Sequence, residues 1–452
     1  MTDSRDETAG AASDPLTDAA PLGPAAESAE PPQHPPVPAS GSVWRTSNYV
    51  RLWVGESLSQ VGENLGTLAI PVIAVVMLHA TSQEVGYLTA AQQLAFLLIG
   101  LPVGAWVDRM RKRRVMIAAD GVRAAVLLTI PAAWAFGALH IWQLYAVAAV
   151  VGGATVFFDV TYQSIVPRLV KPDQVSSANS GLETSAQVAR VGGPALSGFL
   201  LTFLKAPLLL VATAIGYVVS MVAVSTIRDD EPKHVPEAHA SLVKEIGEGL
   251  RFVFTHDLLR RITINTGASN LASGLMTTLM PLFILRELGL PASVFGVVEG
   301  IGSAGGILGA LAAGWFTKRL GEGPTIVWSS FLFTAGGAVF MLAAVWPGAS
   351  IVLMIAGMFV FMFSVVLYNI AQVSFRQRLC PPRLLGRMNA SIRFVVWGVT
   401  PISSAVAGVL GGWMGIVPTM WLGVALTLLA TLIVVAFSPL RTLRKLPDRL
   451  PD

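Results

Sequence analysis

The stretch that decides the fold is Gly104-Ala-Trp-Val-Asp108-Arg109-Met-Arg111-Lys112-Arg113-Arg114, a short basic segment between two long apolar runs. A weaker version, Gly314-Trp-Phe-Thr-Lys318-Arg319-Leu-Gly321, follows about two hundred residues later in the same kind of setting. Glycine lets two helix ends approach closely, and clustered cations hold a loop on one side of a membrane. The repetition therefore predicts a membrane protein built from two related halves.

The composition supports a membrane protein. Of the 452 residues, 53% are hydrophobic and only 13% are charged, and the mean hydropathy is +0.64. A soluble domain could not cover that much apolar surface with so few polar residues. The chain is long enough for about a dozen spans of roughly 20 residues each.

Charge is distributed unevenly along the chain. The first 42 residues hold seven acids and one base, so the net charge of +4 leaves about +10 for the rest. These cations lie in loops beside apolar runs, which favours contact with anionic lipid and argues against nucleic acid as a partner. Residues 1–43 are rich in Pro, Ala, Ser and acids, and they predict a disordered tail rather than a signal peptide.

The lengths of the apolar runs predict twelve membrane spans. Gly137, Lys205-Ala-Pro207, Pro347-Gly348 and Gly411-Gly412 are expected to separate runs that are too long for one crossing. The expected spans are about 54–78, 86–106, 115–137, 142–166, 178–203, 207–227, 262–285, 292–316, 325–346, 350–374, 389–413 and 418–437.

Nearly all Lys and Arg residues fall in every second loop and in the C-terminal tail, whereas the alternate loops hold only Lys205 and Arg286. This pattern requires an even number of spans with both termini in the cytoplasm. The predicted fold is an all-α integral membrane protein with twelve transmembrane helices in two pseudo-symmetric six-helix bundles. Its expected parts are the acidic cytoplasmic tail 1–43, the N-terminal bundle 44–227, a central cytoplasmic loop 228–261, the C-terminal bundle 262–438 and a basic cytoplasmic tail 439–452.

The second part of the central loop predicts an amphipathic helix. Leu242, Ile246, Leu250, Val253 and Phe254 fall on one helical stripe, opposite charged residues. Such a helix lies at the membrane surface or packs on the ends of the transmembrane helices, and the sequence leaves both open.

Charged residues inside a membrane need a partner or a function, because a buried charge is costly there. Glu63 lies twelve residues after Arg51, about 18 Å along a helix, and therefore near mid-membrane. We predict Glu63, Asp159 and Glu183 as candidate proton-coupling residues. For Glu63 the alternative is a structural, hydrogen-bonded acid.

Two further intramembrane charges are expected to be paired. Arg190 lies four residues before Pro194 in the fifth span. It either pairs with an acid from another helix or binds an anionic group of a substrate. Glu299, in the eighth span, is expected to pair with Arg286 across a loop.

The hairpin is predicted to act as a gate. Asp120 and Arg123 are one helical turn apart and can form an ion pair close to it. We expect Asp108 and the cations of residues 109–114 to latch the two halves in the outward-open state. The alternative is that the hairpin only fixes the topology. The predicted gating residues are Gly104, Asp108, Arg109, Arg113, Asp120 and Arg123.

The remainder of the expected cavity is apolar, aromatic and weakly polar. This lining suits large lipophilic compounds better than sugars, which need more amide and acidic groups. The candidate cavity residues are Asn64, Phe158, Arg190, Asn265, Asn270, Tyr368, Gln372 and Trp397.

Several stretches, in their order and spacing, resemble the major facilitator superfamily over about residues 44–440. The 104–114 hairpin is similar to that superfamily's signature between its second and third spans. Arg51-Leu-Trp-Val-Gly55, Phe157-Phe-Asp159 and Gly386-Arg387-Met-Asn389 resemble the branch of transmembrane secretion effectors, which contains macrolide-efflux and enterobactin-export proteins. The resemblance implies the major facilitator fold.

The resemblance also implies a direction of transport. Gly193, Pro194 and Gly198 in the fifth span are similar to the motif of the superfamily's exporters, although the pattern is incomplete. Drug/proton antiporters of the superfamily carry an arginine in the fourth span, where this chain has Ala149. Another residue must therefore fill that role if transport is coupled to protons.

The expected function is secondary active export of amphiphilic small molecules such as drugs or antibiotics, by alternating access and proton antiport. A multi-pass protein of the bacterial inner, or cytoplasmic, membrane is implied. One alternative is export of a siderophore or another anionic metabolite, which Arg190 would bind. The other is a membrane sensor that has the fold without transport.

The sequence gives no sign of an enzyme or of a bound cofactor. It contains no Gly-x-x-x-x-Gly-Lys-Ser/Thr loop, no His-Glu-x-x-His pair and no Gly-x-Ser-x-Gly elbow. A single cysteine, Cys380, excludes an internal disulfide and a multi-cysteine metal site. The expected partners are a lipophilic substrate, protons and membrane lipid, with the chain acting as a monomer.

We predict that Asp108→Asn abolishes transport while expression stays normal, because the hairpin loses the carboxylate of its latch. Flux into membrane vesicles and the amount of protein in the membrane measure the two properties. Full transport by the variant would leave the hairpin as a topological anchor alone.

Overall fold

The computed structural model describes residues 42–108, 110–171, 174–227, 242–381, 384–436 and 438–442. Every regular element in these ranges is helical. The predicted acidic tail up to residue 41, the first part of the central loop (228–241) and residues 443–452 of the basic tail lie outside the described residues.

The N-terminal half forms α1 (Ser47–Val72), α2 (Ser82–Asp108), α3 (Lys112–Ala135), α4 (Ile141–Leu169), α5 (Val175–Leu200) and α6 (Ala206–Ser225). Local sequence sets several of the ends. Thr81 N donates to Glu84 Oε2 at 2.7 Å and Thr81 Oγ1 accepts from Glu84 N, a capping box at the start of α2. Gly137 has a φ of +66° in the turn after α3, and Pro207 lies in the first turn of α6, as predicted.

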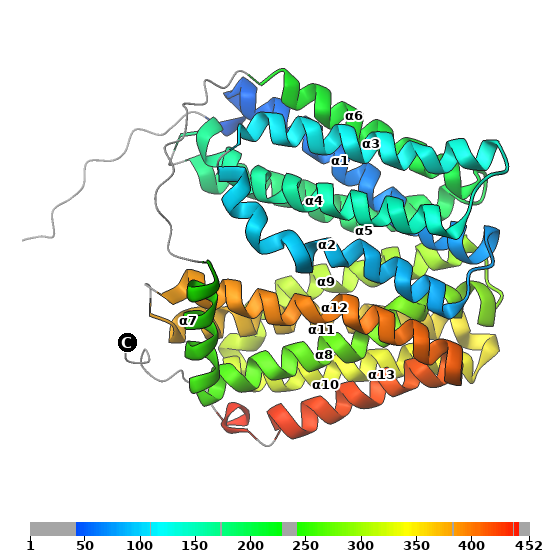
Figure 1. The fold of residues 1–452 in the computed structure, drawn as a ribbon. Helices are drawn as coiled ribbons and strands as arrows, with labels where there is room; N and C mark the ends of the chain where they lie inside the picture. Colours follow the sequence, from blue (N-terminus) through cyan, green and yellow to red (C-terminus); the bar gives the residue numbers. More distant parts are fainter. Residues whose placement is uncertain are drawn as a thin grey trace, which may run out of the picture. The chain divides into compact units, whose positions relative to one another are not determined.

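The C-terminal half forms α8 (Asp257–Leu282), α9 (Ala292–Leu320), α10 (Glu322–Met341), α11 (Ser350–Leu379), α12 (Leu385–Met414) and α13 (Ile416–Ala430), preceded by α7 (Leu242–Thr255) (Figure 1). The shorter elements are η1 (Val43–Arg45), η2 (Ile73–Met77), η4 (Phe283–Glu287), η5 (Leu342–Ala344), η6 (Pro347–Ala349), η8 (Thr431–Ala436) and η9 (Pro439–Arg441). Cys380, directly after α11, is 2% exposed, and burial raises the pKa of its thiol.

Ten of the helices in the described part of the chain, some with their short continuations, are long and apolar enough to cross a membrane. α2 and α5 are not among these ten, so the count of twelve spans stays a prediction. α1 starts at Ser47 and α11 ends at Leu379, beyond the predicted spans, because polar helical turns continue past the apolar runs. The predicted break at Gly411-Gly412 is wrong. Both glycines lie inside α12, and the chain turns at Gly415, which has a φ of +94°.

The two halves are related by a shift of 210 residues. Thr213 of α6 packs on Gly62 of α1, as Gly423 of α13 packs on Ala272 of α8. α1 contacts α5 and α6 while α8 contacts α12 and α13, and the pairs α2–α4 and α3–α4 recur as α9–α11 and α10–α11. Other contacts that obey the shift are Asn64–Gly193 with Gly274–Ser403, and Gly86–Gly408 with Gly296–Gly198. The repeat predicted from the two hairpins thus extends through the helix packing.

The halves meet closely at the end that contains η2 and η4, here called the sealed end. Gly86 of α2 lies against Gly408 of α12 so closely that a Cβ atom at Gly86 would be 2.6 Å from Gly408 Cα. Gly198 of α5 and Gly296 of α9 make the equivalent contact. In addition, Arg286 Nη2 donates to the carbonyl oxygen of Ala80 in the other half at 2.7 Å.

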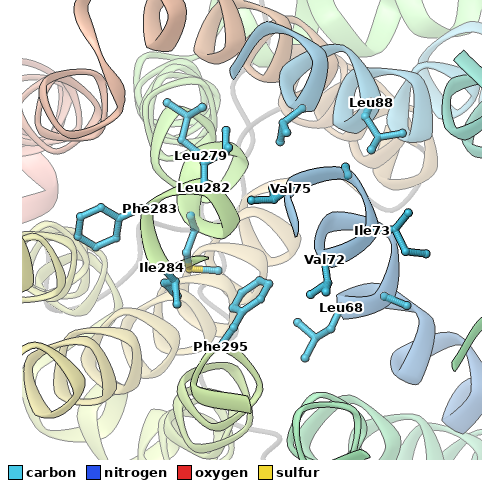
Figure 2. Packing of buried hydrophobic residues seen from close by; sticks show 14 of the residues in the cluster. Leu68, Val72, Ile73, Val75, Leu88, Leu279, Leu282, Phe283, Ile284 and Phe295 are labelled. Atoms are coloured by element: carbon cyan, nitrogen blue, oxygen red, sulfur yellow. The ribbon is translucent and has the colours of Figure 1, made fainter. Parts of the chain in front are cut away.

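An apolar cluster fills the space between the halves at the sealed end. Leu68 and Val72 come from α1, and Leu282, Ile284 and Phe295 come from the C-terminal half. Figure 2 shows the ring of Phe295 directed toward Leu68 and Val72. Because these side chains are buried, they close this end to solvent.

α7 lies at the opposite end, here called the α7 end. Glu248 of α7 forms an ion pair with Arg387 near the start of α12, and Gly249 packs on the backbone of Arg387. Val253 is fully buried, and α7 contacts α8 and α12 (Figure 1). Of the two alternatives for the amphipathic helix, packing on the helix ends is therefore the one observed.

We predict that His79→Gly raises the free energy of unfolding by about 1 kcal/mol, because a side chain is strained at positive φ. Among the described residues, His79 alone combines a side chain with positive φ, at +52°, and the shift of 210 places Gly289, at +60°, in the equivalent position. Thermal unfolding in detergent measures the change. Gly289→Ala is the matched control and should lower the stability; a His79→Gly protein no more stable than the wild type would contradict the argument.

Candidate functional site

Arg123 of α3 lies at the centre of the polar interior of the N-terminal half. Its side chain is 1% exposed and forms an ion pair with Asp120 one turn earlier. The guanidinium lies 4.3 Å from the ring centroid of Phe158 on α4 and 4.3 Å from that of Tyr217 on α6. Two cation–π contacts thus hold a charge that has been removed from water.

Three further acids surround this arginine. Glu56, Glu63 and Asp159 lie within electrostatic range of Arg123. With Asp120, four carboxyl groups lie near the Arg123 guanidinium, and Arg393 of α12 also acts on Asp159, so the acids outnumber the nearby arginines and a net negative charge remains when all four are ionised. Arg123 Nε and one carboxylate oxygen each of Glu56 and Asp120 are buried without a hydrogen-bond partner among the described residues. Protons or a cationic ligand can balance such a cluster.

A cavity of about 600 Å³ borders the cluster. Glu63 and Asp159 supply its carboxylates, and apolar residues of α1, α2, α4 and α6 supply most of the wall. Trp397 of α12 reaches it from the other half, and its ring centroid lies 5.5 Å from that of Phe96 on α2. The volume is in the range of small-molecule sites, and the mixture of aromatic rings and acids suits an amphiphilic ligand.

The predicted site residues are only partly brought together. Glu63, Asp159 and Trp397 line this cavity, whereas Glu183 is exposed on α5 and accepts a hydrogen bond from Gln187 Nε2 at 2.6 Å. Phe158 is buried as a ring partner of Arg123 rather than as a lining residue. Asn64 donates to the carbonyl oxygen of Gln60 at 2.8 Å and packs on Gly193.

Neither of the two expected ion pairs is present in the described part of the chain. Arg190 is exposed on α5 and has no ion pair with any described residue. The pairing of Glu299 with Arg286 is wrong, because Arg286 binds the carbonyl oxygen of Ala80 across the sealed end instead. Arg286 lies in the π-helical turn η4, and from there its side chain reaches the other half.

The C-terminal half holds a second, smaller cavity of about 60 Å³. Asn265, Asn270 and Tyr368, three of the predicted cavity residues, line it. Gln372 lies one turn beyond Asn369 on α11 and donates to Asn369 Oδ1 at 3.3 Å. All of these groups are neutral, in contrast to the cluster around Arg123.

Several lining residues of the large cavity were not predicted. Gln92 and Gln93 contribute amide groups from α2, Phe96 contributes a ring one turn later, and Tyr217 contributes its ring from α6. The adjacent glutamines stand inside the long apolar run of α2, and this interruption was a signal for an interior-facing stretch.

Comparison with known proteins identifies the family. Residues 52–403 match the sequence profile described as Major Facilitator Superfamily, which is most of the chain. The chain belongs to the Major Facilitator Superfamily. It is therefore a multi-pass membrane protein with a transport function rather than an enzyme.

Relatives within the superfamily include named efflux pumps. The multidrug efflux pump Tap of Mycolicibacterium fortuitum is 25% identical over 393 residues, which are 84% of this chain and 92% of that protein. The protein of the same name from Mycobacterium tuberculosis (strain ATCC 25618 / H37Rv) is 23% identical and covers 86% of this chain and 93% of its own length. The macrolide-efflux and enterobactin branch is not distinguished by these matches.

Several solved transporter structures share the fold. A bacterial homologue of the iron transporter ferroportin in the inward-facing state has a TM-score of 0.68 at 17% identity, covering 87% of this chain and 98% of that one. The same homologue in the outward-facing state gives 0.54 at 17% identity, with 86% and 98% covered. The nucleoside transporter NupG gives 0.67 at 13% identity, with 86% and 98% covered.

The basic hairpin of residues 104–114 is bound to the end of α6, a helix of the same half. Arg113 donates from Nε to the carbonyl oxygen of Val224 at 3.3 Å and from Nη2 to that of Ser225, both in the last turn of α6. A cation at a helix C-terminus satisfies free carbonyl groups and complements the helix dipole. Arg109 and the side-chain position of Asp108 lie outside the described residues, as do the surroundings of Gly104, so the gating role stays a prediction.

Gly193, Pro194 and Gly198, which resemble the motif of the superfamily's exporters, lie at contacts between helices. Gly193 packs on Asn64 of α1, and Gly198 packs on Gly296 of the other half. Pro194, between them, lies inside α5, and its carbonyl oxygen faces Gly296. The residues of the motif therefore allow close helix contact at the sealed end, whichever direction transport takes.

We predict that Arg123→Gln destabilises the transporter by about 3–5 kcal/mol, because it leaves buried carboxylates without their cation. The matched control is Arg260→Gln. Arg260 forms an ion pair of the same i,i+3 spacing with Asp257, but its side chain is 46% exposed. This control should cost less than about 1 kcal/mol. Thermal unfolding in detergent compares the two, and equal effects would show that burial of the Arg123 pair is unimportant.

Proposed function

We propose that this transporter is a monomeric exporter of amphiphilic small molecules, driven by proton antiport, in a bacterial cytoplasmic membrane. The cavity of about 600 Å³ carries the proposal, since it combines apolar walls, exposed rings and two carboxylates. A lipophilic body can pack on Phe96 and Trp397 while a polar or cationic group approaches Glu63 or Asp159. The relatives named multidrug efflux pumps support export over uptake.

The proposed orientation places the α7 end in the cytoplasm. Lys and Arg are frequent at that end, including Arg111, Arg168 and Arg319, whereas the turns of the sealed end hold Lys205 and Arg286. Positive loops remain on the cytoplasmic side of a membrane. With this orientation, the contacts of the sealed end close the outer side. The higher TM-score to the inward-facing than to the outward-facing ferroportin homologue agrees with this state.

Proton coupling is proposed at Glu63 and Asp159. Both face the cavity and both lie within electrostatic range of Arg123. A proton that binds one of them lowers the excess negative charge of the cluster, and a cationic substrate does the same. Because both ligands neutralise the same excess charge, they compete, which is the requirement for exchange of one against the other.

An anionic substrate such as a siderophore fits this site less well. The charged residues that line the large cavity are acids, and Arg190 is not among its lining residues. A sensor without transport is excluded by any flux above that of vesicles that lack the protein.

The test is uptake of a lipophilic fluorescent dye and of a macrolide into inverted membrane vesicles, with and without an inside-acid proton gradient. We expect gradient-dependent uptake by the wild type and at least a tenfold loss in Glu63→Gln and in Asp159→Asn, because each removes a titratable group from the cluster. Glu287→Gln, at an exposed position of the sealed end, is the matched control and should retain uptake.

Uptake that survives in both cavity variants would refute the assignment of coupling to these residues. If neither compound is taken up by the wild type but a siderophore is, the proposed substrate class is wrong.

A further inference from the structure

The repeat of 210 residues relates the small neutral cavity to the charged cluster. Five residues of the cluster have equivalents, 210 residues later, that line the small cavity: Glu56, Asp120, Arg123, Phe158 and Asp159. Their equivalents in the C-terminal half are Thr266, Ser330, Phe333, Tyr368 and Asn369, and all five line the cavity of about 60 Å³. The same place in the fold is therefore an ionic cluster in one half and a polar, uncharged cavity in the other.

The neutral cavity has a defined hydrogen-bond network. The Tyr368 hydroxyl lies 2.7 Å from Thr266 Oγ1 and 3.3 Å from Asn265 Nδ2, which donates to it. Asn265 Nδ2 also lies 3.5 Å from Ser330 Oγ. The network comes from α8, α10 and α11, so it is positioned by three packed helices rather than by a loop.

One acceptor of this network, Asn265 Oδ1, lacks a donor within the residues that the structure describes, and so does Gln372 Oε1, which lies beside the neutral cavity but does not line it. Asn265 is 1% exposed, and its Oδ1 has no hydrogen-bond partner among the described residues. Gln372, whose amide nitrogen holds Asn369, is 4% exposed, and its Oε1 is likewise unpartnered in the described part of the chain. A buried acceptor without a hydrogen-bond donor is unfavourable. A ligand that donates a hydrogen bond to this acceptor therefore binds more tightly than one that does not.

One residue that lines the neutral cavity is accessible from outside the packed helices. Asn369 is exposed, and its equivalent, Asp159, lines the large cavity. With about 60 Å³, the site has room for a group of about two water-sized units, such as a hydroxymethyl or a carboxamide group. No carboxylate lines it, so an ammonium group would enter without a counter-charge.

We propose that this cavity is a subsite for a neutral hydrogen-bond donor, a hydroxyl or an amide N–H, of the transported molecule. The inference rests on the proposed function and specifies the substrate class: an amphiphile with a neutral donor group that lies between Asn265 and Tyr368. A substrate that lacks the donor leaves Asn265 Oδ1 unpaired and binds less tightly.

The test compares two lipophilic cations that differ by one hydroxyl group, ethyltriphenylphosphonium and (2-hydroxyethyl)triphenylphosphonium. Their binding to the purified full-length protein is measured by isothermal titration calorimetry. We expect the hydroxyl compound to bind about tenfold more tightly to the wild type. The preference should vanish in Tyr368→Phe and in Asn265→Leu, while binding of the ethyl compound stays within about twofold.

The matched control is Thr334→Val. Thr334 is buried on α10 one turn after Ser330, and its hydroxyl donates to the carbonyl oxygen of Ser330, but it does not line the neutral cavity. This variant should keep the tenfold preference. Thermal unfolding identifies any variant that is misfolded, and Tyr368→Phe, which removes a single oxygen atom, is the more conservative of the two test variants.

Equal affinities in the wild type, no binding of either cation, or a preference that survives in both test variants would overturn the subsite; in each case the cavity holds water at most. The proposed function is decided separately by gradient-driven flux of the dye and the macrolide. A transporter that exports those compounds without a hydroxyl preference keeps its function and loses the subsite. One that shows the preference without flux keeps the subsite and loses proton-driven export.

Discussion

Close contact between glycine backbones is the constraint on which the arrangement of the two halves depends. In a bilayer, lipid tails are as apolar as leucine, so helices associate through packing and hydrogen bonds rather than through the hydrophobic effect. Gly86 with Gly408, and Gly198 with Gly296, allow two helix pairs to approach until their backbones touch. The apolar cluster around Phe295 and the hydrogen bond from Arg286 are positioned by that approach.

The internal repeat separates two kinds of chemistry on one scaffold. The same helices pack in the same order in both halves, yet Arg123 and its acids occur in one half, and Phe333 with neutral hydrogen-bonding groups occurs in the other. A charged interior in a membrane is expensive to maintain. Confining it to one half leaves the second half free to recognise the uncharged part of a ligand.

Much of the architecture could be predicted from the sequence, because apolar runs, basic loops and turn residues are local signals. The basic hairpin and its weaker version at residues 314–321 indicated the repeat. Glu63 and Asp159 were predicted as site residues because acids are rare in apolar runs. The depth of a side chain in the helix bundle and the direction in which it points were harder to predict. The sequence predicts the ion pair of Arg123 with Asp120 but does not show that Phe158 and Tyr217 enclose the guanidinium, and the gating role of Arg123 stays a prediction. The partner of Arg286 was missed because the sequence does not show that η4 lies beside Ala80 of the other half.

The buried cysteine after α11 makes this chain convenient for labelling. Cys380 is the sole cysteine of the sequence, its side chain is almost fully enclosed, and its thiol is held in the unreactive, protonated form by burial. Maleimides and methanethiosulfonates therefore find little to modify in the natural protein. A cysteine introduced at either end would be labelled according to its own accessibility, with little background labelling of Cys380. Opening and closing of the two ends can therefore be followed without first removing the native thiol.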